Sequence, residues 1–136
     1  MVERRITDGR RIAQLLASEL SGREDGEFAH LSVADADRDV EPTPDGARAY
    51  DVHHGDDRLA RVFVHDERAR LEFDALAELA RSAATDGELR VELDERTASK
   101  AFVFVEDGAQ VKRAADVVEA VSRSVSADGV SDADGG

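Results

Sequence analysis

The spacing of apolar residues between positions 47 and 73 most constrains the fold, because it predicts three strands in quick succession. Apolar and polar side chains alternate over residues 47–53, 59–65 and 69–73, which is the two-residue period of a strand with one buried face. The connections are too short for the helical crossover that joins parallel strands. We therefore expect an antiparallel sheet, in which the last two strands form a hairpin through His65-Asp66-Glu67.

Three amphipathic helices and three further strands complete the expected fold. Helices are predicted at residues 8–20, after an Asp74 cap, and after an Asp107 cap, since apolar side chains recur there every three or four positions. The further strands are expected at residues 28–34, 89–93 and 101–105. The sequence thus predicts a single α+β domain of order αββββαββα, an antiparallel sheet of about six strands with three helices mainly on one face.

Two parts of the chain stand out from this pattern. The run Ala101-Phe-Val-Phe-Val105 is continuously apolar, which predicts the most buried strand, at the centre of the sheet. After Ser122 the helical pattern fades into Ser, Ala, Asp and Gly. We therefore expect a globular domain over residues 1–122 and a disordered acidic tail over 123–136.

The charge of the chain is strongly unbalanced. Asp and Glu number 31 against 18 basic residues, of which only Lys100 and Lys112 are lysine, and the formal net charge is −13. Short carboxylates hold water and cations, so such an arginine-for-lysine, acidic surface suits concentrated salt. The same charge repels phosphate backbones, so nucleic acid is not expected as a partner. No apolar stretch approaches the roughly 20 residues that span a bilayer, and we expect no membrane association.

Several segments resemble a known group of sequences. They are Ile6-Thr-Asp-Gly-Arg-Arg-Ile, Arg48-Ala-Tyr-Asp-Val, Arg61-Val-Phe-Val-His and Val103-Phe-Val-Glu-Asp-Gly. The chain resembles a family of small acidic proteins of haloarchaea that has no known activity. The resemblance implies a cytoplasmic protein and assigns no residue a role.

Metal ligation is one function that the sequence suggests. The acidic loop after the first predicted strand carries alternating Asp35, Asp37 and Asp39, which are hard oxygen donors. The loop fails as an EF-hand, because its sixth position holds Val40 instead of glycine. Histidines supply the other candidate ligands, namely His53, His54 and His65. Because His53 and His54 are adjacent, we expect their side chains on opposite faces of a strand.

A basic island at the N-terminus consists of Arg4, Arg5, Arg10 and Arg11. Cations in the first turn of a helix oppose the helix dipole, so these arginines make sense if they contact an acidic partner. The alternative is that they pair with the chain's own carboxylates. A weaker candidate site, for anions, is formed by Lys100, Lys112 and Arg113.

Catalysis has no positive sign in the sequence. There is no cysteine, no serine in a nucleophile elbow, and no phosphate-binding loop or dinucleotide fingerprint, so neither catalytic residues nor a cofactor is indicated. The leading hypothesis is a non-enzymatic module that binds a protein partner or a second copy of itself. The alternative is a small enzyme or a ligand- or metal-binding protein whose His/Asp or Lys/Arg site is assembled in space.

Overall fold

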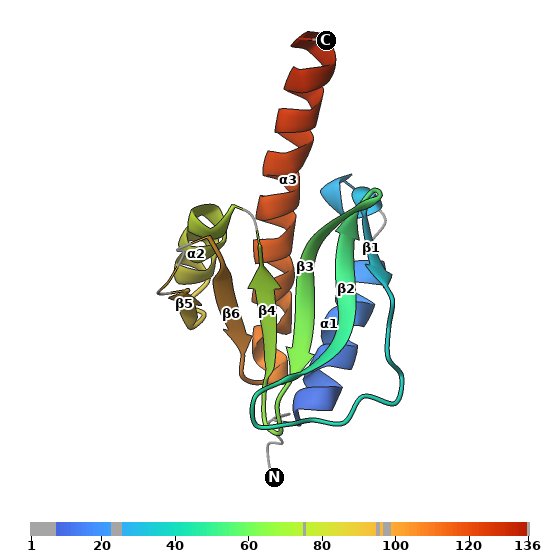
Figure 1. Ribbon diagram of the computed structural model, residues 1–136, viewed down its shortest axis with the longest axis vertical. Helices are drawn as coiled ribbons and strands as arrows, with labels where there is room; N and C mark the ends of the chain where they lie inside the picture. Colours follow the sequence, from blue (N-terminus) through green and yellow to red (C-terminus); the bar gives the residue numbers. More distant parts are fainter. Residues whose placement is uncertain (1–7, 23–25, 75, 95, 97–98, 136) are drawn as a thin grey trace.

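The computed structural model describes residues 8–22, 26–74, 76–94, 96 and 99–135. It confirms a single α+β domain with the element order αββββαββα, plus two short 3-10 helices (Figure 1). The elements are α1 (Gly9–Gly22), η1 (Gly26–His30), β1 (Leu31–Ala34), β2 (Ala47–His54), β3 (Asp57–Val64), β4 (Ala69–Phe73), α2 (Ala77–Asp86), β5 (Val91–Leu93), β6 (Ala101–Val105), η2 (Gly108–Gln110) and α3 (Val111–Gly135).

The six strands form one antiparallel sheet in the order β1-β2-β3-β4-β6-β5. The predicted hairpin is confirmed: β3 and β4 pair from Ala60↔Phe73 to Val64↔Ala69. The register of β2 against β3 shifts twice, once near each end of the paired segment. Such bulges bend and twist the strands locally.

All three helices lie against one face of the sheet, as expected. In Figure 1 strands β3 and β4 are drawn in front of α3, with α1 beside it, and the other side of the sheet faces the viewer. The helix stripes predicted from the sequence are buried: Ile12, Leu16 and Leu20 of α1 are 0% exposed. They share one hydrophobic core with alternate strand residues such as Val62, which is equally buried. Burial of a Leu or Ile side chain contributes about 1.5–3 kcal/mol, so these contacts hold the helical layer to the sheet.

The first residues of α1 pack closely against the β3–β4 hairpin. Asp8 caps the helix, because its Oδ1 accepts hydrogen bonds from the backbone N–H groups of Arg10 (2.9 Å) and Arg11 (3.2 Å). The Gly9 N–H donates to the Asp66 carbonyl at 3.0 Å. A Cβ on Gly9 would lie 1.9 Å from the His65 carbonyl oxygen. Only glycine permits this approach of helix and turn.

Three local expectations were wrong. Phe28 lies in η1 and not in the first strand. Asp74 does not cap α2: its carboxylate pairs with Arg58 at 2.8 Å, and α2 begins after Leu76, whose φ of 57° is left-handed. Strand β6 is not central, because it lies between β4 and the edge strand β5. Its apolar run has another cause, since arginine side chains cover its second face.

Helix α3 continues past residue 122, where the sequence pattern fades, and ends at Gly135. Its C-terminal part extends well beyond the sheet in Figure 1. Packing also continues past the expected boundary, because Ser126 Oγ donates to Glu27 Oε2 at 2.6 Å. Ser126 thus packs against η1 from within the segment expected to be a tail, and the boundary at residue 122 stays a prediction.

Candidate functional site

None of the helices in the described residues lies on the second side of the sheet, and we call this surface the open face. Strand alternation sends polar and aromatic side chains to it while the apolar ones enter the core. Neighbouring strands align these side chains in two rows across the sheet. The rows are Arg48–Phe63–Arg70–Phe104 and Asp51–Arg61–Glu72–Phe102–Glu92.

Arginine side chains stack on the phenylalanines of the open face. The Arg70 guanidinium lies 4.5 Å from the centre of the Phe63 ring and 5.5 Å from that of Phe102. Phe104 is covered by Arg68 at 4.4 Å and Arg90 at 5.5 Å. These distances allow cation–π attraction, worth about 0.5–1 kcal/mol at exposed sites. Phe63 and Phe102 keep part of their surface exposed, whereas Phe104 is buried.

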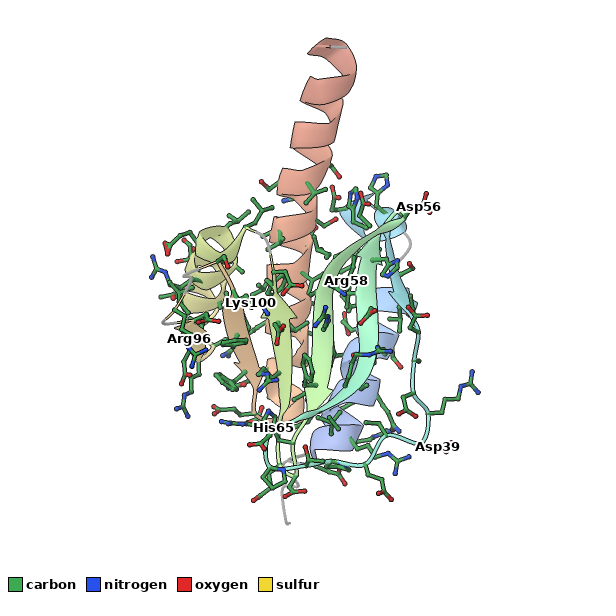
Figure 2. All side chains as sticks on the ribbon, in the orientation of Figure 1. Asp39, Asp56, Arg58, His65, Arg96 and Lys100 are labelled. Carbon is green, nitrogen blue, oxygen red and sulfur yellow. The ribbon has the colours of Figure 1, made fainter. Side chains whose placement is uncertain are left out.

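Ion pairs connect the rest of the open face. Glu72 is only 7% exposed, with one oxygen 3.6 Å from Lys100 Nζ and 3.9 Å from Arg61 Nη1. Arg58 and Lys100 also contact the Asp74 carboxylate, at 2.8 and 3.9 Å, and both side chains are labelled on the sheet in Figure 2. A buried carboxylate needs such partners, so Glu72 holds the surrounding cations in place.

The open face carries little net charge, although the chain as a whole is strongly negative. Its ion pairs, its ring contacts and the cluster at its β1–β2 edge involve seven basic and six acidic side chains, of the 18 and 31 in the whole sequence. The basic ones are Arg48, Arg58, Arg61, Arg68, Arg70, Arg90 and Lys100, and the acidic ones are Asp35, Asp51, Glu72, Asp74, Glu92 and Glu106. These thirteen side chains carry a formal charge of +1, so the rest of the sequence carries −14.

Two of the metal candidates come together at the β1–β2 edge of the open face. Asp35, directly after β1, lies with His53 and with Asp51, and one ligand atom of each lies within 4.8 Å of the others. Sequence reasoning missed Asp51, although its position two residues before His53 on a strand was the available signal. Asp37 and Asp39 instead form a local turn, in which Asp37 Oδ1 accepts the Asp39 N–H at 3.0 Å.

His54 points to the opposite face from His53, as predicted, and contacts α3. Its Nε2 lies 2.8 Å from Ser126 Oγ and 3.5 Å from Glu27 Oε2, and that oxygen also accepts hydrogen bonds from Ser122 (2.7 Å) and Ser126 (2.6 Å). This is not a catalytic triad. The single hydroxyl proton of Ser126 goes to Glu27, so the histidine donates to the serine instead of accepting its proton. The cluster anchors α3 on η1.

The pKa of Glu27 reflects this anchoring. Burial alone would raise the pKa of Glu27, but hydrogen bonds from Ser126 and Ser122 and the nearby His30 and His54 outweigh it. The net pKa of Glu27 lies below its ordinary value.

The third histidine candidate, His65, lies at the other end of the sheet (Figure 2). It is 7% exposed, and its Nδ1 lies 2.9 Å from the Pro44 carbonyl, so that Nδ1 carries the proton and donates it. Burial lowers the pKa of His65, with the charges of Arg70 and Arg68 adding to the effect and the Pro44 hydrogen bond opposing it. The buried His65, near the other end of the sheet, is not part of the cluster of Asp35, Asp51 and His53.

The basic island is described only in part, because Arg4 and Arg5 lie outside the described residues. Arg10 Nη2 donates to the Arg38 carbonyl at 3.1 Å and Arg11 Nη1 to Gln14 Oε1 at 3.4 Å. Within the described part of the chain, neither guanidinium has a carboxylate within 4.0 Å. The alternative of internal charge pairing therefore finds no support at Arg10 and Arg11 among these residues.

The anion candidates are not brought together. Lys100 precedes β6 and pairs with Glu72, whereas Lys112 and Arg113 follow it on the first turn of α3. The five residues of β6 separate them by about 17 Å. Arg113 is engaged with the Gly87 carbonyl at 3.5 Å.

A pocket of about 310 Å³ lies between α1 and the segment that follows β1. The lining is mainly apolar and consists of Ala13, Ala17, Val33, Val40 and Tyr50. Arg10 and Arg38 form a polar part of its wall. The Tyr50 hydroxyl donates a hydrogen bond to the Ala13 carbonyl at 2.7 Å, and burial raises the pKa of Tyr50. The hydroxyl is therefore not suited to act as an acid or a base. The pocket offers shape and apolar contact, at the lower end of the size of ligand sites.

None of the helices in the described part of the chain is long and apolar enough to cross a membrane. Fold and site define a one-domain α+β protein whose antiparallel sheet has one helix-covered face and one open, charge-balanced face. The chain belongs to a family of unknown function, DUF7993, whose family model matches residues 1–134. Neither the curated proteins nor the solved structures gave a match.

Proposed function

We propose that the chain is a non-enzymatic interaction module that associates with a second copy of itself through the open face, in the salt-rich cytoplasm of a halophile. The carrying observation is the composition of the open face: seven cations, six anions and partly exposed phenylalanines in a chain of net charge −13. Elsewhere, contact between two copies would bring net negative surfaces together.

Charge at contact distance matters most in concentrated salt. At molar ionic strength the Debye length is about 3 Å, so long-range repulsion and attraction are both screened. Along one row of the open face the sign alternates from Asp51 to Arg61 to Glu72 on successive strands. A second copy shifted by one strand therefore sets cations against anions, which makes the open face self-complementary, as a two-fold interface requires.

The aromatic side chains supply the apolar part of such a contact. Phe63 and Phe102 are partly exposed beside Arg70, and aromatic and arginine side chains are the types enriched in protein interfaces. The same face is unsuited to nucleic acid, since Glu72 within β4 and Asp74 directly after it would oppose phosphates.

Light-scattering mass in molar KCl tests the proposal. The wild type is expected at the mass of two 14.7 kDa chains, and the double variant Phe63→Asp/Phe102→Asp at the mass of one. Arg61→Glu is a milder variant, because the Arg61 side chain is 33% exposed, and Arg61→Lys is its conservative control. A monomeric wild type, or an unchanged mass in both Arg61→Glu and the double variant, would overturn the proposal.

The basic island provides a matched comparison. Arg10→Glu/Arg11→Glu reverses two exposed charges on α1 and improves the match to the helix dipole. If the open face is the contact, this variant stays dimeric. If it alone dissociates, the island and not the open face holds the copies together.

A second candidate function, favoured by the pocket beside α1, is the binding of a small apolar ligand. The observation is the 310 Å³ volume with its lining of Ala, Val and Tyr side chains. A fluorescent dye with an apolar ring system, such as anilinonaphthalene sulfonate, should bind the folded protein. Ala17→Leu, which fills the pocket, should abolish the signal. Equal dye binding by the variant would remove this candidate.

A further inference from the structure

The cluster at the β1–β2 edge of the open face has the composition and spacing of a metal site. Two carboxylates, Asp35 and Asp51, and one imidazole, His53, place a ligand atom each within 4.8 Å of the others. Metal–oxygen and metal–nitrogen bonds of about 2.0–2.2 Å place two ligand atoms on one ion at most about 4.4 Å apart. Small side-chain rotations therefore suffice to bring the three onto one ion.

The backbone fixes two of these ligands. Asp51 and His53 are two residues apart on β2, and their strand neighbours on β1 are Ala34 and Ser32. Asp35 follows at the end of β1 with a φ of 53°, so the chain leaves the strand beside Asp51. Ligands on a paired strand are held more rigidly than ligands on a loop, and two of the three are so held.

The cluster already attracts a cation. Asp51 is 9% exposed, and its Oδ1 accepts a hydrogen bond from Arg48 Nη1 at 3.2 Å. The other end of the same guanidinium, Nη2, donates to the Asp35 carbonyl at 3.1 Å. Because the Arg48 side chain is 40% exposed, it can turn to solvent when another cation takes its place.

The donor set selects the class of metal. An imidazole with two carboxylates suits borderline divalent ions such as Zn²⁺, whereas Ca²⁺ and Mg²⁺ take oxygen ligands. We propose that Asp35, Asp51 and His53 bind a divalent transition-metal ion of the zinc class, with Arg48 as the competing cation. The site goes beyond the proposed self-association and does not depend on it.

Calorimetric titration of the full chain with ZnCl₂ in molar KCl tests this site. We expect one Zn²⁺ per chain and an affinity reduced by tenfold or more in His53→Ala, with no heat from MgCl₂. His30→Ala is the matched control, because His30 lies outside the cluster and its loss should leave the affinity unchanged. Asp51→Asn should act like His53→Ala, and the partly exposed His53 keeps the test valid if the Asp51 variant does not fold.

Arg48→Met gives the sharpest outcome, because it should tighten Zn²⁺ binding severalfold by removing the competitor. General damage to the β1–β2 edge would weaken binding instead. Co²⁺ absorption bands that appear in the wild type and vanish in His53→Ala would locate the ion spectroscopically. Equal Zn²⁺ affinity in wild type and His53→Ala, or Mg²⁺ binding as tight as Zn²⁺, would overturn the proposal.

Discussion

Replacing Gly9 by alanine should destabilise the domain, against the usual rule for helices. Alanine in place of glycine favours a helix by up to about 1 kcal/mol. At Gly9, however, the new methyl group would lie 1.9 Å from the His65 carbonyl oxygen and 2.5 Å from that of Arg68. Both are backbone atoms of the β3–β4 turn, so no side chain can rotate away.

The size of the effect follows from this geometry. A methyl group needs about 3.5 Å from an oxygen, so α1 and the turn must separate by more than 1 Å. Overpacking of this kind costs about 1–3 kcal/mol. Moving α1 away from the turn also lengthens the hydrogen bond from the Gly9 N–H to the Asp66 carbonyl. We expect a net loss of about 1–3 kcal/mol in the free energy of unfolding.

Urea unfolding at constant molar KCl measures the change. Gly22→Ala is the matched control on the last residue of the same helix, where a Cβ would have no atom within 4 Å among the described neighbours. It should be neutral or stabilising by a few tenths of a kcal/mol to about 1 kcal/mol. A Gly9→Ala protein as stable as Gly22→Ala would refute the close packing of α1 on the turn.

Three further predictions concern salt, the sheet and pH. The melting temperature should rise steeply from low salt to molar KCl, because screening relieves the repulsion of a −13 chain; a salt-independent melting temperature would remove the halophilic interpretation. Val103→Asp should prevent folding, since Val103 lies in the core. Phe104→Asp should fold with reduced stability, because Arg68 and Arg90 lie beside the new carboxylate. A cooperative thermal transition of Val103→Asp would contradict this prediction. The folded pKa of Glu27 lies below its unfolded value near 4.5, so its contribution to stability is present above that pH and lost as pH falls through the folded pKa. Glu27→Gln should therefore flatten the dependence of the free energy of unfolding on pH in this range. An unchanged dependence would show that the serine contacts are not formed.

The sequence predicted most of the fold because its signals are local. Strand alternation and short connections gave the antiparallel pairing of β2, β3 and β4, and the three-to-four spacing gave the buried side of each helix. The prediction that β6 is the central strand was wrong for a physical reason. A continuous apolar run normally marks a strand covered on both sides by other elements, whereas Phe102 and Phe104 are covered by arginines from neighbouring strands.

The candidate sites depend on contacts that alternation alone does not reveal. Asp35 and His53 were separate candidates in the sequence, and their meeting with Asp51 requires the register of β1 against β2. Asp74 has the pattern of a helix cap, yet Arg58 from β3 takes its carboxylate. The charge balance of the open face likewise appears only when all strands are aligned.

Spin-label distances between chains test the open-face contact most directly. The chain has no cysteine, so Ser32→Cys gives a unique label position on the open face, opposite His53 and outside the ion pairs of the proposed contact, and Arg81→Cys gives an exposed control on α2. In molar KCl, the account predicts a short interchain distance at position 32 and a much longer one at position 81. A short distance at 81, or no dipolar coupling at 32, would contradict it.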